Sequence, residues 1–468
     1  MRKSIVLFRN DLRMHDNPLI NHCIQNKCEI LPLYVIDNEN AIGSASKWWL
    51  HESLESLDRS LNNNLLVVPG KTTQVLEELI NKYSINEIVF SKRYEKNEIA
   101  KDREIEKLSN KHEVKVFIYN SSLLLDPVDH LKKDGNPYKV YTPFYKQRYS
   151  GLSFECHSYD VNELKFLKIV QSSSSEILND LLLPENHWYK KLYESWTPGE
   201  DGAHDRLSVF LESGLQNYSE GRNRPDLPHT SMLSPHLRFG EISPRQIVKS
   251  LGQINTINHE TFYKELVWRE FSYHLLYHFP HVTHSNLQTK FDNLKWENNK
   301  NHLKSWQKGL TGYPIIDAGM RQLWQTGYMH NRVRMIVGSF LVKNLLTHWK
   351  YGQEWFWDTL VDADIANNSA SWQWVAGTGA DAAPYFRIFN PVTQSKKFDP
   401  DGKYIRKYVP ELKNIPNKYI HLPSELDQQS LMECGVKLGS DYPYPIVDLS
   451  ITRERALSAF KKLSKSTS

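Results

Sequence analysis

Polar and aromatic side chains recur with a helical spacing between residues 362 and 374. Asp364, Asn368 and Trp372 lie four residues apart, so they share one face of a helix. A carboxylate and an amide are costly to bury beside an indole unless they find partners. The pattern indicates a face that meets a polar ligand or water, although a purely structural role fits the same spacing.

Two further segments place groups that suit a planar polar ligand on one helix face. Glu265 and Trp268 are three residues apart, and Asn331 and Met335 are four apart. An amide can hydrogen-bond to the edge of a base, and a thioether packs well on a ring. Spacing alone also fits a core tryptophan beside a surface carboxylate, and a capped helix start beside a core methionine.

Two other segments suit phosphate groups. Thr230, Ser231 and Ser234 supply three hydroxyls within five residues, directly before Pro235, which suits either a phosphate or ordinary helix capping. Residues 386–420 contain eight basic and three acidic side chains, a local net charge of +5. This segment indicates either a nucleic-acid backbone footprint or a solvated surface.

The elements that must position these groups differ along the chain. The first third alternates short apolar runs with amphipathic stretches, which predicts a parallel α/β sheet. It contains neither Gly-x-Gly-x-x-Gly nor a Walker loop. The expected strands are Ser4–Phe8, Glu29–Ile36, Leu65–Pro69, Glu87–Phe90 and Val114–Tyr119, and the expected helices here are Lys47–Asn62 and Thr73–Tyr83.

Long amphipathic stretches dominate after residue 201, which predicts a second, all-helical domain. The expected domains are therefore an α/β domain over 1–128, a connector over 129–200 and a helical domain over 201–468. The expected helices of the last are Ala203–Ser213, Pro244–Leu251, Glu260–Tyr277, Ile315–Thr326, Arg332–Trp349 and Glu354–Leu360.

Composition excludes several classes of protein. The 468 residues are too many for one ordinary core, and 24% charged with 40% hydrophobic residues is typical of a globular chain. No apolar run approaches the roughly 18 residues of a membrane helix, and no signal peptide is visible. The four cysteines show no disulfide, zinc or iron–sulfur spacing, so we expect a reduced cytoplasmic location and no metal. Of the 13 tryptophans, 11 lie between Trp188 and Trp374, an excess that a plain core does not explain.

Several long motifs, in order along almost the whole chain, resemble the DNA photolyase/cryptochrome family. They are Phe8-Arg9-Asn10-Asp11-Leu12-Arg13 with His15-Asp16-Asn17, Trp268-Arg269-Glu270-Phe271, Thr311-Gly312-Tyr313-Pro314, Trp372-Gln373-Trp374 and Arg387-Ile388-Phe389-Asn390-Pro391. The resemblance implies a Rossmann-like, antenna-binding α/β domain followed by an all-α, FAD-binding catalytic domain. It also implies reduced FAD as the catalytic cofactor and light-driven electron transfer to a flipped-out lesion.

The resemblance assigns roles to individual residues. Asn368 would approach the flavin N5, and Arg334 would pair with Asp362. Met232 stands where this loop often has Arg or Gly. The residues implied for FAD are Tyr218, Thr230, Ser231, Met232, Leu233, Ser234, Phe262, Arg334, Asp362, Asp364 and Asn368.

The resemblance also implies a DNA site and an electron-transfer chain. Trp268 and Trp374 would stack on the extruded dimer, while Glu265, Asn331 and Met335 would contact the pyrimidines. Trp296, Trp349 and Trp372 would reduce the flavin from the surface. The side chains implied for the DNA are Glu265 together with Arg222, Arg332, Gln394, Lys396 and Lys397.

Subfamilies are separated by particular residues. Photolyases for the (6-4) lesion carry two histidines where this chain has Asn331 and Met335, and DASH cryptochromes usually have Tyr at Trp374. We therefore expect a monomeric, class I-like or closely related bacterial photolyase that repairs cyclobutane pyrimidine dimers (CPD) in DNA. A signalling cryptochrome, a (6-4) photolyase and a dark flavoprotein oxidoreductase are the alternatives. Asn97 and Glu98 match antenna positions for methenyltetrahydrofolate, with a deazaflavin as the competing chromophore.

Overall fold

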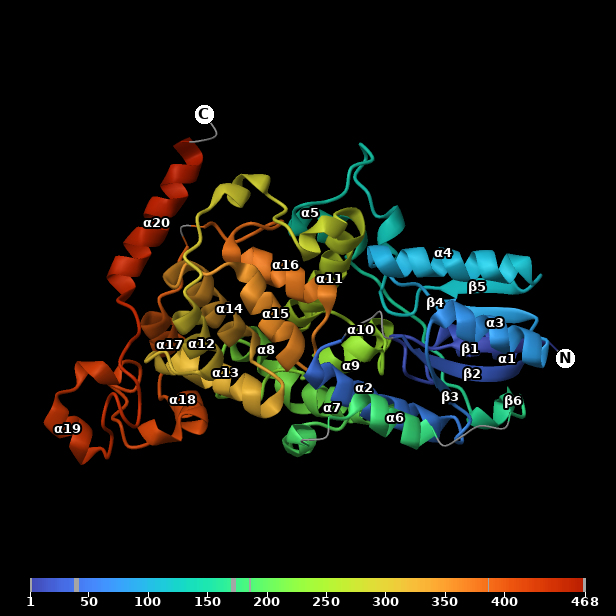
Figure 1. Cartoon of the computed structure of the whole chain (residues 1–468), viewed down its shortest axis with the longest axis horizontal. Coiled ribbons are helices and arrows are strands. Elements are labelled where there is room, and N and C mark those ends of the chain that lie inside the picture. The colour runs from blue at the N-terminus through green and yellow to red at the C-terminus, as the bar shows by residue number, and fades with distance from the viewer. Residues whose placement is uncertain (1, 38–41, 170–173, 185–186, 386, 466–468) are drawn as a thin grey trace. The chain divides into compact units, whose positions relative to one another are not determined.

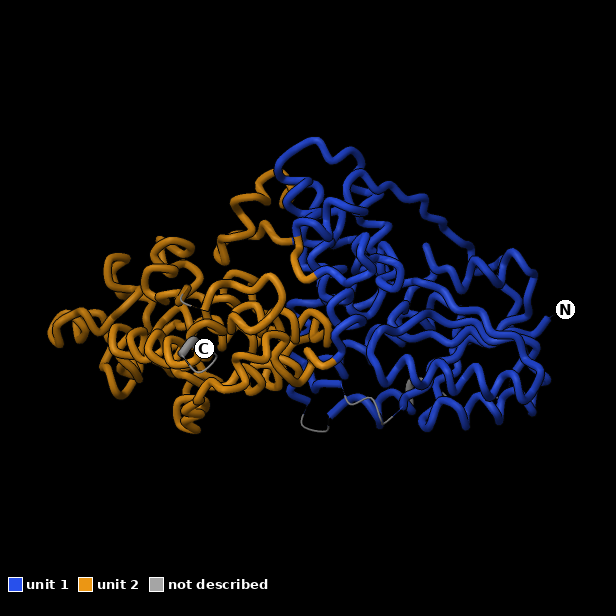
Figure 2. Tube along the Cα trace, turned by 90° about the horizontal axis from the view of Figure 1, so that it is seen from above, with its two compact units in different colours: residues 1–138, 142–212, 231–280 blue, residues 139–141, 213–230, 281–468 orange. Residues whose placement is uncertain are grey.

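The protein is described by a computed structural model that covers residues 2–37, 42–169, 174–184, 187–385 and 387–465. Contacts divide it into two compact units, each built from several segments (Figure 2). Unit 1 contains residues 1–138, 142–212 and 231–280, and unit 2 contains residues 139–141, 213–230 and 281–468. The expected boundaries at residues 128 and 200 cut the chain into consecutive pieces, whereas each compact unit combines separate segments. The expected boundaries therefore stay a prediction.

Unit 1 is built on a parallel sheet with the strand order β3-β2-β1-β4-β5 (Figure 1). Its register places Ile5 beside Leu31 on one neighbour and beside Ile88 on the other. The predicted α/β class is confirmed, and each predicted strand is present within one or two residues. The strands are β1 (Lys3–Leu7), β2 (Glu29–Ile36), β3 (Leu66–Pro69), β4 (Glu87–Ser91) and β5 (Lys115–Tyr119), and the unpredicted β6 (Lys165–Phe166) pairs with β2.

Helices cover this sheet because both of its faces are apolar. On one face, Ile5 and Phe90 from the strands pack with Leu76 of α3 in a buried cluster. On the other face, Val6 and Val89 are also fully buried. Such double coverage is the usual environment of a parallel sheet. The helices of this unit are α1 (Pro18–Gln25), α2 (Ser44–Ser60), α3 (Thr72–Tyr83), α4 (Lys96–Lys111), α5 (Tyr141–Arg148), α6 (Ser174–Leu182), α7 (Glu200–Val209), α9 (Ser234–Phe239), α10 (Pro244–Leu251) and α11 (Ile257–His278).

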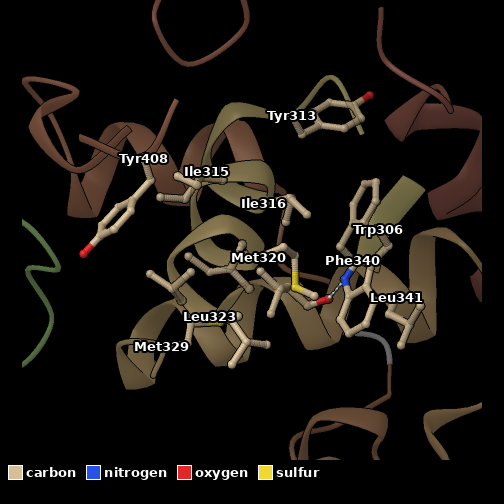
Figure 3. Packing of buried hydrophobic residues seen from close by; sticks show 14 of the residues in the cluster. Trp306, Tyr313, Ile315, Ile316, Met320, Leu323, Met329, Phe340, Leu341 and Tyr408 are labelled. Atoms are coloured by element: carbon tan, nitrogen blue, oxygen red, sulfur yellow. Dashed lines mark hydrogen bonds between the residues drawn. The ribbon is translucent and has the colours of Figure 1, made fainter. Parts of the chain in front are cut away.

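Unit 2 is helical, and its core is rich in aromatic side chains (Figure 3). Trp306 is fully buried, and its indole N–H donates to the carbonyl of Val337 over 3.1 Å. Met320, Phe340 and Leu341 surround it. The helices are α8 (Tyr218–Gly221), α12 (Lys300–Lys308), α13 (Pro314–Thr326), α14 (Asn331–Ser339), α15 (Trp349–Thr359), α16 (Ile365–Ala376), α17 (Pro391–Phe398), α18 (Lys403–Tyr408), α19 (Gln428–Glu433) and α20 (Leu449–Lys465).

The single helix expected over Arg332–Trp349 is wrong. The α14 helix ends at Ser339, a π-helical turn follows over Phe340–Asn344, and Leu346 adopts a left-handed φ of 48°. A new helix begins at Trp349 after His348 accepts a hydrogen bond from the N–H of Lys350. Among the described residues, no helix is long and apolar enough to cross a membrane.

Candidate functional site

The first polar group of the candidate site lies on α14 in unit 2. Arg334 Nη2 donates to Asp362 Oδ2 over 2.8 Å, and Arg334 Nε donates to the carbonyl of Met329 over 2.7 Å. Burial works against the charged guanidinium, but the Asp362 carboxylate outweighs it and raises the pKa of Arg334. A fixed, charged guanidinium suits the recognition of a polar ligand.

The helix α16 carries the second group. Asp364 is its N-cap and accepts the N–H of Asn367 over 2.8 Å, as expected of a carboxylate at this position. Asn368 and Trp372 follow one and two turns later. Asp364, Asn368 and Trp372 are 5%, 8% and 3% exposed, so the stripe inferred from spacing is buried rather than solvated.

The third feature of unit 2 is a pair of buried ring nitrogens. Neither His330 Nε2 nor Trp372 Nε1 has a hydrogen-bond partner within the described chain. Orphaned buried polar atoms are rare in folded proteins and call for a bound molecule or water. Such unpartnered groups suit the polar edges of a cofactor such as FAD, and Arg334 on α14 and Asn368 on α16 carry further polar groups of unit 2.

Sequence reasoning missed His330. Its Nδ1 accepts the N–H of Arg332 over 3.2 Å and so caps α14. Burial and the nearby arginines lower the pKa of His330 to about 3, so the ring is neutral. The signal was available in the sequence, because a histidine directly before an Asn-Arg helix start can act as a cap.

The hydroxyl-rich loop over 230–234 has an unusual backbone. Met232 adopts a φ of 56°, which is uncommon for a side chain larger than glycine. The N–H of Leu233 donates to Ser231 Oγ over 3.4 Å. Thr230 hydrogen-bonds to the Tyr328 side chain, and Ser234 is exposed at the start of α9. A loop with an uncommon backbone conformation that hydrogen bonds hold in place is typical of binding segments.

A cluster around Arg332 joins three segments of unit 2. Arg332 Nε donates to Asn223 Oδ1 over 3.2 Å, and its Nη1 contacts Met335 Sδ at 3.5 Å. The guanidinium also lies 4.5 Å from the ring centre of Phe398, at the end of α17. The structure therefore brings together two of the predicted residues, Arg332 and Met335, with Asn223, which was not predicted.

Other predicted DNA contacts of unit 2 lie at its surface. Lys396 and Lys397 are exposed on α17, and Gln394 is half-buried. The Arg222 guanidinium lies 5.6 Å from the ring centre of Tyr218 on α8. The basic segment predicted to start at Phe386 is described only from Arg387 onwards, since Phe386 lies outside the described residues.

Unit 1 holds the remaining predicted residues of the catalytic and flavin sets on α11. Phe262 is buried against Phe210, with ring centres 4.5 Å apart. Glu265 and Trp268 are both half-buried one turn apart, and Trp268 packs on Phe271 at 5.8 Å. Asn331 and Trp374, by contrast, belong to unit 2, where Asn331 is exposed at the start of α14 and Trp374 is half-buried on α16.

The three tryptophans expected to carry electrons are linked by packing in unit 2. Trp296 and Trp349 both pack on His348, with ring centres 5.0 and 5.3 Å apart. Trp349 is fully buried and its indole N–H donates to Asn286 over 2.9 Å. Gly352, one turn beyond Trp349, lies directly against the Trp372 ring. His348 was not predicted.

The two predicted antenna residues lie in different environments of unit 1. A cavity of about 210 Å³ opens at the carboxyl ends of β1 and β2, which is where parallel sheets usually bind ligands. Glu98 lines it and is 3.7 Å from Lys101 Nζ, whereas Asn97 is exposed and lies outside it. Arg9, Tyr34 and the other lining residues were not predicted from the sequence.

Comparison with family models covers both ends of the chain. Residues 4–160 match the model described as DNA photolyase, and residues 262–462 match the model described as the FAD binding domain of DNA photolyase. The matched FAD-binding segment contains Phe262, Arg334 and the α16 stripe.

Comparison with individual proteins extends over nearly the whole chain. It is 44% identical to a deoxyribodipyrimidine photo-lyase of Agrobacterium fabrum, over 99% of this chain and 98% of that protein. It is 33% identical to Cryptochrome-1 of Arabidopsis thaliana, over 98% of this chain and 70% of that one. A solved bacterial class III photolyase from Agrobacterium tumefaciens matches with a TM-score of 0.95 and 42% identity, over 99% of this chain and 98% of that one. The chain therefore belongs to the DNA photolyase/cryptochrome family.

Proposed function

We propose that the protein is a deoxyribodipyrimidine photo-lyase that repairs cyclobutane pyrimidine dimers in DNA under light. The observation that carries the proposal is the arrangement on α16. Buried polar groups suited to a flavin, Asp364 and Asn368, share this helix with Trp372, which packs against the Trp349 helix α15. A site that combines cofactor binding with an aromatic path is suited to light-driven electron transfer. The near-complete match to a named photo-lyase supports the same activity.

The residues that would hold FAD are those with fixed polar groups. The Arg334–Asp362 pair and the Asn368 amide would meet polar edges of the cofactor, and the loop over 230–234 would offer hydroxyl and backbone N–H groups to its phosphates. When bound and fully reduced, FAD would supply the light-driven one-electron chemistry that splits the cyclobutane ring.

The protein's own groups would recognise the dimer after it leaves the stack. The damaged pair stacks poorly, which lowers the cost of extrusion. Trp268 and Trp374 would each offer an aromatic face, worth about 1–3 kcal/mol per base. Glu265 and Asn331 would hydrogen-bond to the pyrimidine edges, and Met335 would pack on the rings. Arg222, Arg332, Gln394, Lys396 and Lys397 would hold backbone phosphates.

The decisive experiment is light-dependent repair of two defined duplexes, one with a CPD and one with a (6-4) lesion. We expect repair of the CPD only, because Asn331 and Met335 stand where (6-4) photolyases carry histidines. Repair of the (6-4) duplex alone would reverse the substrate assignment. Failure to repair either duplex, with FAD bound and reduced, would favour the signalling function of the cryptochrome relatives.

A matched pair of variants on α11 tests the recognition residues. Glu265→Leu removes both carboxyl oxygens, and we expect dimer affinity to fall about tenfold, the weight of one hydrogen bond. Glu260→Leu, on the same helix and at a residue paired with Lys264, is the control and should bind normally. FAD absorbance reports folding in both variants. Equal affinity and quantum yield in both would remove Glu265 from the site.

We also propose that the unit 1 cavity binds a second, light-harvesting chromophore. It combines apolar walls, such as Leu50 and Phe239, with the charged groups of Arg9, Glu98 and Lys101. A solved archaeal photolyase from Sulfolobus tokodaii, 30% identical with a TM-score of 0.83, is described as having two FAD molecules, with the implication of a novel light-harvesting cofactor. Methenyltetrahydrofolate is our assignment and a deazaflavin or second flavin the alternative. The absorption spectrum of the chromophore released from purified protein distinguishes them.

A further inference from the structure

A buried cluster of metal-binding side chains lies at the amino end of the unit 1 sheet. His22 on α1, Cys28 before β2 and Glu87 at the start of β4 place their ligand atoms within 4.8 Å of one another. His22 Nε2 is 3.0 Å from Glu87 Oε1, and Cys28 Sγ is 3.2 Å from the same oxygen. The three residues are 7%, 4% and 1% exposed. The cavity described above opens at the opposite, carboxyl end of the strands, so the cluster is separate from it.

The Glu87 carboxylate is incompletely satisfied. Its second oxygen, Oε2, is buried and has no hydrogen-bond partner within the described chain. A buried carboxylate is normally paired with a cation, or else its oxygens are all hydrogen-bonded. Since Oε1 already contacts His22 and Cys28, it is the unpartnered Oε2 whose buried charge a bound cation would compensate.

The orientation of His22 also favours a metal. Tyr119 Oη is 2.8 Å from His22 Nδ1, the ring nitrogen that does not contact Glu87. Metal-binding histidines usually have their other ring nitrogen held by a hydrogen bond of this kind. The contact with Tyr119 therefore fixes the ring with Nε2 turned toward the cluster.

We propose that His22, Cys28 and Glu87 bind one Zn²⁺ ion as its three protein ligands. Thiolate, imidazole and carboxylate are the ligand types that zinc takes, at about 2.0–2.3 Å. A tetrahedron with those distances separates its ligand atoms by about 3.3–3.8 Å, so the separations of 3.0 and 3.2 Å need only small side-chain shifts. The ion would tie α1 to the amino ends of β2 and β4. The site could not be recognised from the spacing of residues along the chain, because Glu87 is 59 residues beyond Cys28.

The test measures zinc in the whole purified protein, produced in zinc-supplemented medium and passed through a chelating resin. We expect about one equivalent in the wild type and in Cys434→Ser, whose cysteine lies outside the cluster. We expect less than about a tenth of that in Glu87→Gln and in Cys28→Ser. The isosteric Glu87→Gln variant guards against misfolding, and FAD absorbance reports folding in every sample.

Two results would overturn the proposal. Wild-type protein without zinc after production in supplemented medium excludes the site, whatever the variants do. Zinc retained equally by Glu87→Gln and Cys28→Ser identifies an adventitious surface ion only. Thermal unfolding supplies a second readout, since zinc-free Glu87→Gln should melt several degrees below the wild type while still repairing the dimer.

Discussion

Lys343 is an ammonium group placed in the aromatic core of unit 2. It is fully buried, its Nζ donates to the carbonyl of Arg387 over 2.8 Å, and it lies 5.6 Å from the ring centre of Tyr385. Burial, assisted by the charge of Arg387, lowers the pKa of Lys343 to about 7. One hydrogen bond does not replace the water that a charged ammonium loses.

The lowered pKa predicts how stability changes with pH. Between pH 7 and the unfolded pKa near 10.5, the unfolded chain binds more protons than the folded one, so stability rises with pH by up to about 1.4 kcal/mol per unit. Lys343→Met should remove much of the rise in thermal midpoint between pH 7 and 9. Lys304→Met, at an exposed position of α12, is the control and should keep the rise. An unchanged pH dependence in Lys343→Met would show that the lysine is not the source.

The outermost of the three linked tryptophans gives a second prediction at the residue scale. Trp296 is half-buried and packs on His348. The His348 ring is neutral because burial lowers its pKa to about 4. Trp296→Phe should slow photoreduction of the flavin because phenylalanine is harder to oxidise, yet leave repair by pre-reduced enzyme intact. Trp324→Phe, an exposed tryptophan of α13 outside the predicted path, is the control. Photoreduction at the wild-type rate in Trp296→Phe would remove Trp296 from the path.

At the scale of elements, periodicity predicted most helices and strands but not their interruptions. Pro244–Leu251 is a helix with the predicted bounds, because Ser243 and Pro244 are strong start signals. The break between α14 and α15 gave no such signal, since Leu345 and Leu346 are buried and continue the apolar pattern. The strand β6 was missed because two residues carry no period, and only its pairing with β2 defines it.

The candidate site was predictable to the extent that it is local in sequence. The stripe of Asp364, Asn368 and Trp372 could be recognised because one helix holds all three. Contacts between distant segments could not, as with Asn223 on Arg332 or the cavity around Glu98. Such groupings depend on how the elements pack, which spacing along one segment does not record.

The packing of α15 on α16 gives a prediction at the element scale. A Cβ added to Gly352 would lie 2.1 Å from Cη2 of Trp372, so the indole must move. Alanine is the better helix former by about 1 kcal/mol, but overpacking costs about 1–3 kcal/mol and should win. Gly352→Ala should therefore lower the thermal midpoint and slow photoreduction, as Trp372 is displaced. Glu354→Ala, exposed on the same helix, controls for helix propensity, and a Gly352→Ala variant as stable as this control would contradict the packing argument.

Across the whole molecule the net charge is only +4, but residues 386–420 alone carry +5. The basic side chains of this segment differ in role. Arg406 is engaged in structure, since its guanidinium donates to the carbonyls of Lys413 and Ile415 and to Asn417. Lys396 and Lys397, by contrast, are exposed on α17. The charge count over 386–420 therefore overstates the number of side chains available to phosphates.

The exposed lysines predict the salt dependence of DNA binding. Each contact with a backbone phosphate adds about 0.9 to the slope of log affinity against log salt concentration. Lys396→Ala with Lys397→Ala should lower the slope by about 1.8 if both lysines contact phosphate, and should weaken binding to damaged and undamaged duplexes alike. Arg103→Ala with Lys107→Ala removes the same charge from exposed positions of α4 in unit 1 and is the matched control. Equal slopes for the two double variants would mean that net charge, rather than a phosphate contact on α17, governs binding, whereas a loss confined to damaged DNA would place the lysines at the lesion.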